Sequence, residues 1–333
     1  MNVRVILKSL GVLCFALFFS GCMTAPKPYE QTAFALDTVI DITAYGPNAE
    51  EAVQKSLNEM TRLESLLSNY QENSEITAIN KQAGGPAVSI SLETEQVLQQ
   101  ALRYATVTNG AFDPTIGPIV ELWGIGKKDD FVPSDAEISA ALKHVNYHRL
   151  ELDTTKHTAR LLDKGMSIDV GGVAKGYILD HMEAILKAEG IQSALLNGGG
   201  DIRVIGNKPD GTPWRIGLQN PRDTEGISAK ISLDKWNDIE TSGDYQRFFD
   251  RDGVRYHHIF DPKTGKPTHT LSSASTVLRE GMEDFPSNAL LVLGKEQSLE
   301  LLKQFPGIEA IFVDLDGNVS YTPGLAGSIE TDR

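Results

Sequence analysis

Residues 168–176 read Ile-Asp-Val-Gly-Gly-Val-Ala-Lys-Gly, and apolar residues at helical spacing continue towards residue 189. The stretch predicts a short strand that passes through two glycines into a helix over 172–189. Backbone N–H groups and the positive end of the helix dipole make such a junction a binding place for anions. Lys175 would add a full positive charge, and Asp169 could accept hydrogen bonds from ribose hydroxyls or a base edge. The spacing matches neither a Walker loop nor a dinucleotide fingerprint, and the glycines could instead serve helix packing alone.

Five further segments combine glycines, carboxylates, hydroxyls and histidines. They read GAFDPTIGP at 110–118, NGGGD at 197–201, TSGDY at 241–245, YHHIFDP at 256–262 and DFPSN at 284–288. This mix suits a backbone that wraps a phosphorylated ligand and a metal ion. The glycine run at 197–201 permits positive φ and close ligand approach, although it is also typical of a plain turn before a strand.

The hydroxyls of Thr241 and Ser242, followed by Gly243, predict a turn that holds phosphate oxygens or positions an attacking hydroxyl. A serine hydrolase is excluded because no G-x-S-x-G elbow occurs.

Two adjacent histidines, His257 and His258, lie on a strand predicted over 256–260. Successive side chains of a strand point to opposite faces, so only one of the two can face a given site. That histidine could act as a general base or hold a phosphate, and the other would be an ordinary hydrogen-bonded residue.

A candidate cation site comprises Asp284, Ser287 and Asn288. On a helix, this spacing brings all three side chains to one face. Carboxylate, hydroxyl and amide oxygens are hard ligands that suit Mg²⁺ or Ca²⁺. The alternative is an acidic helix start, with Asp284 as the cap and Pro286 in the first turn.

Two aromatic residues could sandwich a heterocycle. Phe112 would be an apolar plate beside the carboxylate of Asp113, and Tyr70 could supply a second face. Core packing is the alternative for both aromatic rings.

The N-terminus resembles a bacterial lipoprotein signal. Two positive residues precede an apolar run over 10–19, which is too short to span a bilayer, and Cys22 follows small residues. We expect a signal peptide over 1–21, lipidation of Cys22 and a lipidated tether over 22–31. An ordinary secretory signal is the alternative.

The chain is acidic, with a formal charge of −14 that becomes −16 once residues 1–21, which carry two positive and no negative side chains, are removed. An acidic surface argues against nucleic acid and anionic lipid headgroups as partners. It would also repel a bare nucleotide unless a cation intervenes, which favours a metal-assisted site. Cys14 and Cys22 are the only cysteines, so the mature chain has no internal disulfide.

The mix of predicted strands and helices indicates an α/β or α+β fold, and about three hundred residues suffice for one large domain or two intimate ones. Helices are predicted at 48–68, 93–108, 134–142 and 172–189, and strands at 34–44, 194–196, 202–205, 214–219, 227–233, 256–260, 273–278 and 310–313.

Taken in this order, the six segments resemble the motifs of the ApbE family, the FAD:protein FMN transferases, over about residues 31–325. The resemblance implies a single large T-fold-like domain over 32–325, with a nucleotide cleft between sub-lobes, and a C-terminal tail over 326–333. It also implies Mg²⁺-dependent transfer of the FMN part of FAD to a Thr or Ser hydroxyl of a target protein, as a phosphoester, with release of AMP.

The resemblance further implies roles for individual residues. FAD would contact Leu36, Tyr70, Ala111, Phe112, Asp113, Asp169, Lys175, Thr241, Ser242, Gly243, His257 and His258. Mg²⁺ would be held by the carbonyl of Gly172 and by Asp284, Ser287 and Asn288. His258, with Asp284 acting through the metal, would help deprotonate the acceptor. The chain departs from the family at Leu36-Asp37, where Met-Gly is typical, and at Asn288, where Thr is usual.

Two other functions use the same residues: a Mg²⁺-dependent FAD pyrophosphatase, and a periplasmic lipoprotein that binds FAD without chemistry. The targets implied by the resemblance are subunits of membrane redox complexes, such as sodium-pumping NADH:quinone oxidoreductase or Rnf-type complexes. Bacterial members are often periplasmic lipoproteins, which agrees with Cys22. Met23 after this cysteine favours the outer over the inner membrane.

Overall fold

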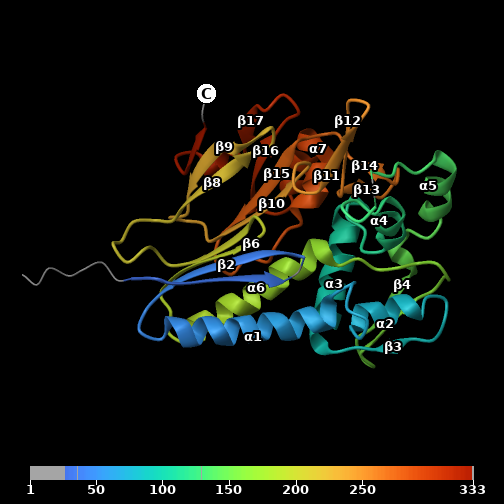
Figure 1. The fold of residues 1–333 in the computed structure, drawn as a ribbon, viewed down its shortest axis with the longest axis horizontal. Coiled ribbons are helices and arrows are strands. Elements are labelled where there is room, and N and C mark those ends of the chain that lie inside the picture. Colours follow the sequence, from blue (N-terminus) through green and yellow to red (C-terminus); the bar gives the residue numbers. More distant parts are fainter. Residues whose placement is uncertain (1–26, 36, 129, 332–333) are drawn as a thin grey trace, which may run out of the picture.

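The computed structural model describes residues 27–35, 37–128 and 130–331, so the predictions for Cys22 and Leu36 lie outside it. Its main sheet has eight strands in the order β1-β2-β6-β7-β10-β15-β16-β17, and neighbouring strands are antiparallel (Figure 1). The strands are β1 Tyr29–Ala35, β2 Thr38–Tyr45, β6 Ser193–Gly198, β7 Asp201–Ile205, β10 Asp238–Gly243, β15 Ser273–Leu278, β16 Glu309–Val313 and β17 Val319–Tyr321.

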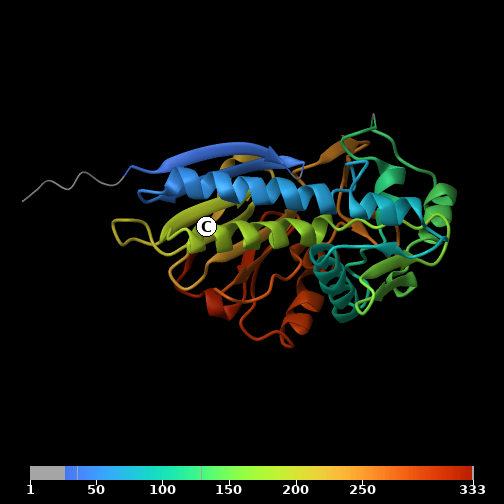
Figure 2. The ribbon, with the colours of Figure 1, turned by 90° about the horizontal axis from the view of Figure 1, so that it is seen from below.

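Helices α1 and α6 lie side by side along one face of this sheet (Figures 1 and 2). Val53, Met60 and Leu63 recur at helical spacing on the buried face of α1. They share the largest apolar core with Ile42 of β2 and Leu179 of α6. The helices are α1 Ala49–Leu67, α2 Glu75–Lys81, α3 Leu92–Val107, α4 Gly117–Trp123, α5 Asp135–Leu142, α6 Gly171–Ala188 and α7 Ser287–Leu302, the last with a kink at Gly294.

The opposite face of the main sheet packs against a three-stranded sheet of β8 Arg215–Asn220, β9 Asp223–Ser232 and β18 Ile329–Thr331. Ile202 and Ile239 point into this second core. Because side chains alternate along a strand, Arg203 of β7 and Glu240 of β10 point to the other face, towards the helices. Alternation therefore places charged residues inside the helical layer.

A second lobe surrounds Trp123, at the end of α4 (Figure 1). The indole N–H donates to the carbonyl of Gly265 at 2.8 Å, and the ring stacks on Phe260. This lobe contains α4, α5 and the hairpins β11 Phe248–Arg251 with β12 Val254–His257 and β13 Phe260–Asp261 with β14 Lys266–Pro267. A small sheet of β3 Val88–Ser89, β5 Thr158–Leu161 and β4 Leu150–Asp153 lies nearby.

The predicted helices at 48–68, 93–108, 134–142 and 172–189 are confirmed as α1, α3, α5 and α6. Ser134 and Glu137 form a reciprocal capping box at the start of α5. The predicted strand at 34–44 is instead a hairpin of β1 and β2, because Asp37 adopts a left-handed backbone with φ of 59°.

Four local predictions are wrong. The strand predicted over 256–260 is interrupted, because β12 ends at His257 and β13 begins at Phe260. Thr241 to Gly243 form no turn but the end of the central strand β10. Asp284 is not on a helix, because α7 begins only at Ser287. Pro286 explains this, since a proline disfavours helical backbone at the residue before it. Residues 168–170 form no strand, and only a single bridge joins Ser167 to Ile116.

The ordered sheets also extend beyond the predicted limits of 32 and 325. β1 starts at Tyr29, inside the predicted tether, and pairs with β2. β18 lies in the predicted tail, where it pairs with β9. β1 is a strand because it pairs with the adjacent β2 in a hairpin, whereas β18 has a partner that is distant in sequence.

Among the residues that the structure describes, no helix combines the length and apolarity needed to cross a lipid bilayer.

Candidate active site

A cleft of about 1730 Å³ lies between the main sheet and the second lobe. Typical pockets for small molecules have volumes of about 300–1,000 Å³, so this one has room for a dinucleotide. The predicted site residues that line the cleft are Tyr70, Ala111, Phe112, Asp113, Asp169, Gly172, Lys175, Thr241, Ser242, His258, Ser287 and Asn288. Gly243, His257 and Asp284 are not among the lining residues.

The start of α6, where the sequence predicts an anion site, forms one wall of the cleft. The carboxylate of Asp169 accepts a hydrogen bond from the N–H of Gly171 at 2.9 Å. Lys175, one turn into the helix, pairs with the buried Asp201 at 2.6 Å. The other oxygen of Asp201 accepts from the N–H of Thr241. These contacts fix the Lys175 ammonium group between α6 and the central strands of the main sheet.

His258 is the histidine that faces the cleft. Its Nδ1 lies 3.4 Å from the carbonyl oxygen of Arg247, which can only accept. This contact favours the tautomer with the proton on Nδ1 and leaves Nε2 as the basic nitrogen. Burial, together with the neighbouring Arg247 guanidinium, lowers the pKa of His258 to about 3. The imidazole is therefore neutral at physiological pH.

His257 points away from the cleft, although a flavin contact was predicted for it. It is fully buried, and its Nε2 lies 2.6 Å from the carbonyl of Thr268. Burial lowers the pKa of His257. β12 ends at His257 and His258 lies in the bend that follows, so the chain turns between the two histidines and only His258 reaches the cleft.

The two aromatic residues predicted to contact the flavin lie in different parts of the cleft: Phe112 in its wall and Tyr70 at its rim. Phe112 is buried, contacts the ring of Tyr104 edge-on and also lines the cleft, so it serves both the core and the site. Tyr70 is exposed at the rim, with the ammonium of Lys127 3.4 Å from its ring centre. Asp113 is buried, and its carboxylate accepts hydrogen bonds from Thr115 and Tyr147, so it fixes the loop beside Phe112.

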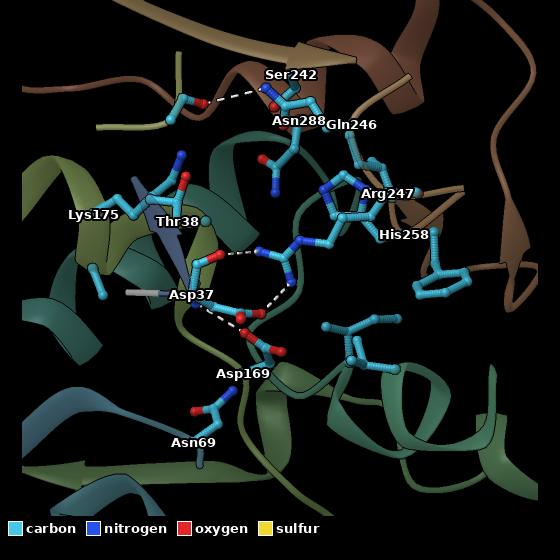
Figure 3. Close-up of a pocket in the computed structure, with 18 of the residues that line it drawn as sticks. Asp37, Thr38, Asn69, Asp169, Lys175, Ser242, Gln246, Arg247, His258 and Asn288 are labelled. Atoms are coloured by element: carbon cyan, nitrogen blue, oxygen red, sulfur yellow. Dashed lines mark hydrogen bonds and ion pairs between the residues drawn. The ribbon is translucent and has the colours of Figure 1, made fainter. Parts of the chain in front are cut away.

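Arg247 and Asp37 form a contact across the cleft that sequence reasoning missed. The guanidinium donates to the carboxylate of Asp37 at 2.7 Å, and Figure 3 shows this pair between Lys175 and His258. The two residues are separated by 210 positions, so no local pattern links them. The available signal was the position of Arg247, two residues after the TSGDY segment. Asn69, beside Tyr70, was also missed; it lines the cleft, with a buried amide oxygen that lacks a hydrogen-bond partner.

Behind the cleft wall, Asp284 belongs to a buried ionic cluster. Arg203 donates to both of its carboxylate oxygens, at 2.6 and 2.5 Å, and also pairs with Asp238 and Asp180. Burial opposes ionisation of Asp284, but Arg203 outweighs it and the pKa of this carboxyl is lowered. Burial and the neighbouring carboxylates raise the pKa of Glu240.

The predicted metal ligands are only partly brought together. Among the described residues, no group of three or more His, Cys, Asp or Glu side chains is arranged to hold a metal ion. Asn288 nevertheless has a buried amide oxygen without a hydrogen-bond partner, and it lies directly against Gly172. The Ser287 hydroxyl bonds that of Ser242 at 2.8 Å. The unpaired amide oxygen of Asn288 is a hard donor that fits a divalent cation. Asp284 could also bind that cation, but only through the carboxylate lone pairs that Arg203 does not use.

Gly176→Ala is expected to destabilise the protein, although the position is helical. Alanine in a helix is ordinarily about 1 kcal/mol more favourable than glycine. Here a Cβ would overlap the carboxylate of Asp284 and lie 2.7 Å from Glu240 Oε1. Overpacking of this kind costs about 1–3 kcal/mol, so we expect a lower urea midpoint. A midpoint above that of wild type would show that the two carboxylates move aside freely.

Comparison with known proteins identifies the chain. The model of the ApbE family matches residues 36–312. The FAD:protein FMN transferase of Treponema pallidum (strain Nichols) is 32% identical, covering 96% of this chain and 94% of its own length. The corresponding protein of Klebsiella pneumoniae (strain 342) is also 32% identical, covering 87% and 90%.

Solved structures agree. The ApbE protein of Thermotoga maritima has a TM-score of 0.82 at 33% identity, covering 91% of this chain and 99% of its own. The Pseudomonas stutzeri flavinyl transferase ApbE has a TM-score of 0.79 at 29% identity, covering 92% and 98%. They confirm the predicted mixed α/β fold. A family match over most of the sequence, relatives above 30% identity along nearly its whole length, and a shared fold together show that this chain belongs to the ApbE family.

Proposed function

We propose that this protein is a FAD:protein FMN transferase, which moves the FMN part of FAD to a Thr or Ser hydroxyl of a target protein and releases AMP. The names of its relatives support the reaction class. The observation that carries the proposal is the cleft itself, in which Lys175, Arg247 and the neutral His258 converge on a space large enough for a dinucleotide.

The site residues divide into two tasks. Lys175 and Arg247 offset the pyrophosphate charge that an acidic protein would otherwise repel. His258 accepts the proton of the acceptor hydroxyl through Nε2 as that oxygen attacks phosphorus, and the bond from phosphorus to the oxygen of AMP breaks. Holding the hydroxyl, the histidine and the phosphate in one cleft supplies the proximity that phosphoryl transfer requires.

A bound Mg²⁺ would stabilise charge on the pyrophosphate oxygens. Asn288, the carbonyl of Gly172, Ser287 and Asp284 are the residues proposed to hold it, on the basis of the orphaned Asn288 oxygen. The target is proposed to be a subunit of a membrane redox complex. The signal at residues 1–21 supports a periplasmic location with a lipid on Cys22, and Met23 after this cysteine favours the outer over the inner membrane.

Lys175→Met is expected to weaken FAD binding by about 10- to 100-fold, the worth of one charge-assisted contact. The substitution removes a positive charge and leaves the buried Asp201 carboxylate without its cation beside the ligand. FAD fluorescence titration measures the effect. Lys55→Met, an exposed residue that pairs with Glu51 and Glu189, is the control and should bind FAD like wild type. Unchanged affinity in Lys175→Met would remove this lysine from the site.

The function is tested by intact-mass spectrometry of a candidate acceptor domain incubated with the protein, FAD and Mg²⁺. A gain of one FMN, lost on chelation, supports the transferase. Cleavage of FAD to FMN and AMP without a mass gain would identify a pyrophosphatase instead. Intact FAD with two unrelated acceptor sequences would identify a binding protein.

A further inference from the structure

Glu240 is a buried carboxylate that reaches the cleft and that the sequence motifs did not single out. It is 6% exposed, lies on β10 directly before Thr241 and Ser242, and lines the cleft. Across from it, α6 carries glycine at position 176, where any larger residue would meet both Glu240 and Asp284. Two carboxylates therefore converge on the same turn of α6.

A second group of oxygens lies one helical turn away. At Gly172, a Cβ would lie 2.7 Å from the amide of Asn288, whose Oδ1 is buried without a hydrogen-bond partner. Ser242, which lies on the same side of β10 as Glu240, bonds Ser287. Carboxylate, hydroxyl and amide oxygens thus line one strip of the wall between α6, β10 and the start of α7.

The available cations leave Glu240 poorly compensated. Arg203 lies 3.8 Å from Glu240, farther than from its other three carboxylate partners, and it holds Asp284 with two contacts. Lys175 already forms an ion pair with Asp201. A side-chain hydrogen bond joins Glu240 to Asp284, so in the metal-free protein a shared proton offsets the repulsion between the two carboxyl groups. Two adjacent buried carboxylates are costly when both are ionised, and a cation that lies close to both could take the place of that proton.

We propose that Glu240 is a ligand of a divalent cation in this cleft, together with the orphaned oxygen of Asn288 and with Asp284. The inference rests on the proposed function for its metal, and it assigns the principal cleft-facing carboxylate to Glu240. Asp284 is the second carboxylate ligand; it lies behind the residues that line the cleft, and Arg203 fixes its orientation. Mg²⁺ and Mn²⁺ both prefer such hard oxygen donors.

The test is direct binding of Mn²⁺ to the full mature chain. Free Mn²⁺ is measured by electron paramagnetic resonance, with and without FAD. Glu240→Gln is expected to weaken Mn²⁺ binding by at least about 10-fold, as loss of metal-site residues commonly does. Glu183→Gln is the matched control: Glu183 is a buried carboxylate on α6 that pairs with Lys187 and does not line the cleft. It should bind Mn²⁺ like wild type.

A second measurement separates a ligand from a structural residue. Without metal, Glu240→Gln should unfold at a temperature no lower than wild type, because the glutamine amide can still donate a hydrogen bond to Asp284. Adding Mn²⁺ should raise the unfolding temperature of wild type and of Glu183→Gln but not of Glu240→Gln.

Equal Mn²⁺ affinity in wild type and Glu240→Gln, or no Mn²⁺ binding by wild type under either condition, would overturn the inference. FMN transfer is scored separately on the same samples. Glu240-dependent Mn²⁺ binding without any transfer would overturn the proposed function and leave the cation site standing.

Discussion

Replacing Arg203 with leucine is expected to lower the free energy of unfolding by about 3–5 kcal/mol, the usual cost of removing one partner from a buried ion pair. Arg203 is 1% exposed and holds Asp284, Asp238 and Asp180. Its loss leaves carboxylates without a cation inside the helical layer. Urea unfolding of the mature chain, followed by circular dichroism, measures the change.

The matched control is Arg215→Leu, which breaks an ion pair of similar length, 2.7 Å, between two exposed side chains, Arg215 and Glu330. Exposed pairs contribute about 0–1 kcal/mol, so this variant should unfold close to wild type. Similar midpoints for the two variants would show that water reaches the Arg203 cluster.

The loss in Arg203→Leu should also depend on pH. In wild type, Arg203 keeps the pKa of Asp284 below its ordinary value, so this carboxylate stabilises the fold above that value and the benefit is lost on acidification. Without Arg203, burial alone would raise the pKa of Asp284 in the folded state. The difference between the two proteins should therefore grow as pH rises above about 4.

His258→Ala is expected to slow FMN transfer by about 10²–10⁴-fold, the range for loss of a general base, while FAD affinity changes by only a few fold. Single-turnover transfer to an acceptor domain, with FAD binding measured separately, tests this. His257→Ala is the control: His257 is fully buried and bonds Thr268, so its loss should lower stability but leave transfer by the folded fraction. Transfer by His258→Ala at the wild-type rate would refute the base assignment.

The pH dependence provides an independent check on His258. Its pKa of about 3 keeps the ring neutral from pH 5 to 8, so kcat/KM should show no step from this residue in that range. The unfolded histidine titrates near 6.5 and takes up a proton first on acidification. Wild type should therefore lose stability relative to His258→Ala as pH falls from about 6.5 towards 3.

The cleft was largely predictable from the chain because its residues come in short, dense segments. Twelve of the predicted site residues line it, among them Phe112, Lys175 and His258. The wrong predictions concern residues whose conformation is set by contacts with segments that are distant in sequence. Gly243 was placed in a turn because glycine favours turns, but β15 pairs with β10 and holds Gly243 in the sheet opposite Ser273. Asp284 was placed on one helical face with Ser287 and Asn288, but it precedes α7, and Arg203 holds it behind the cleft wall.

What the sequence by itself determined is local or collective: the helical spacing of α1, α3 and α6, the capping box at Ser134, and a set of motifs specific enough to place the chain in its family. Spacing and capping act within a few residues, so the order of side chains encodes them. Only the tertiary structure decided the ionic partners: Arg203 meets Asp284 across 81 positions, and Arg247 meets Asp37 across 210. Such pairs depend on strand register and on which helix covers which face, and burial then sets how strongly each charge is felt.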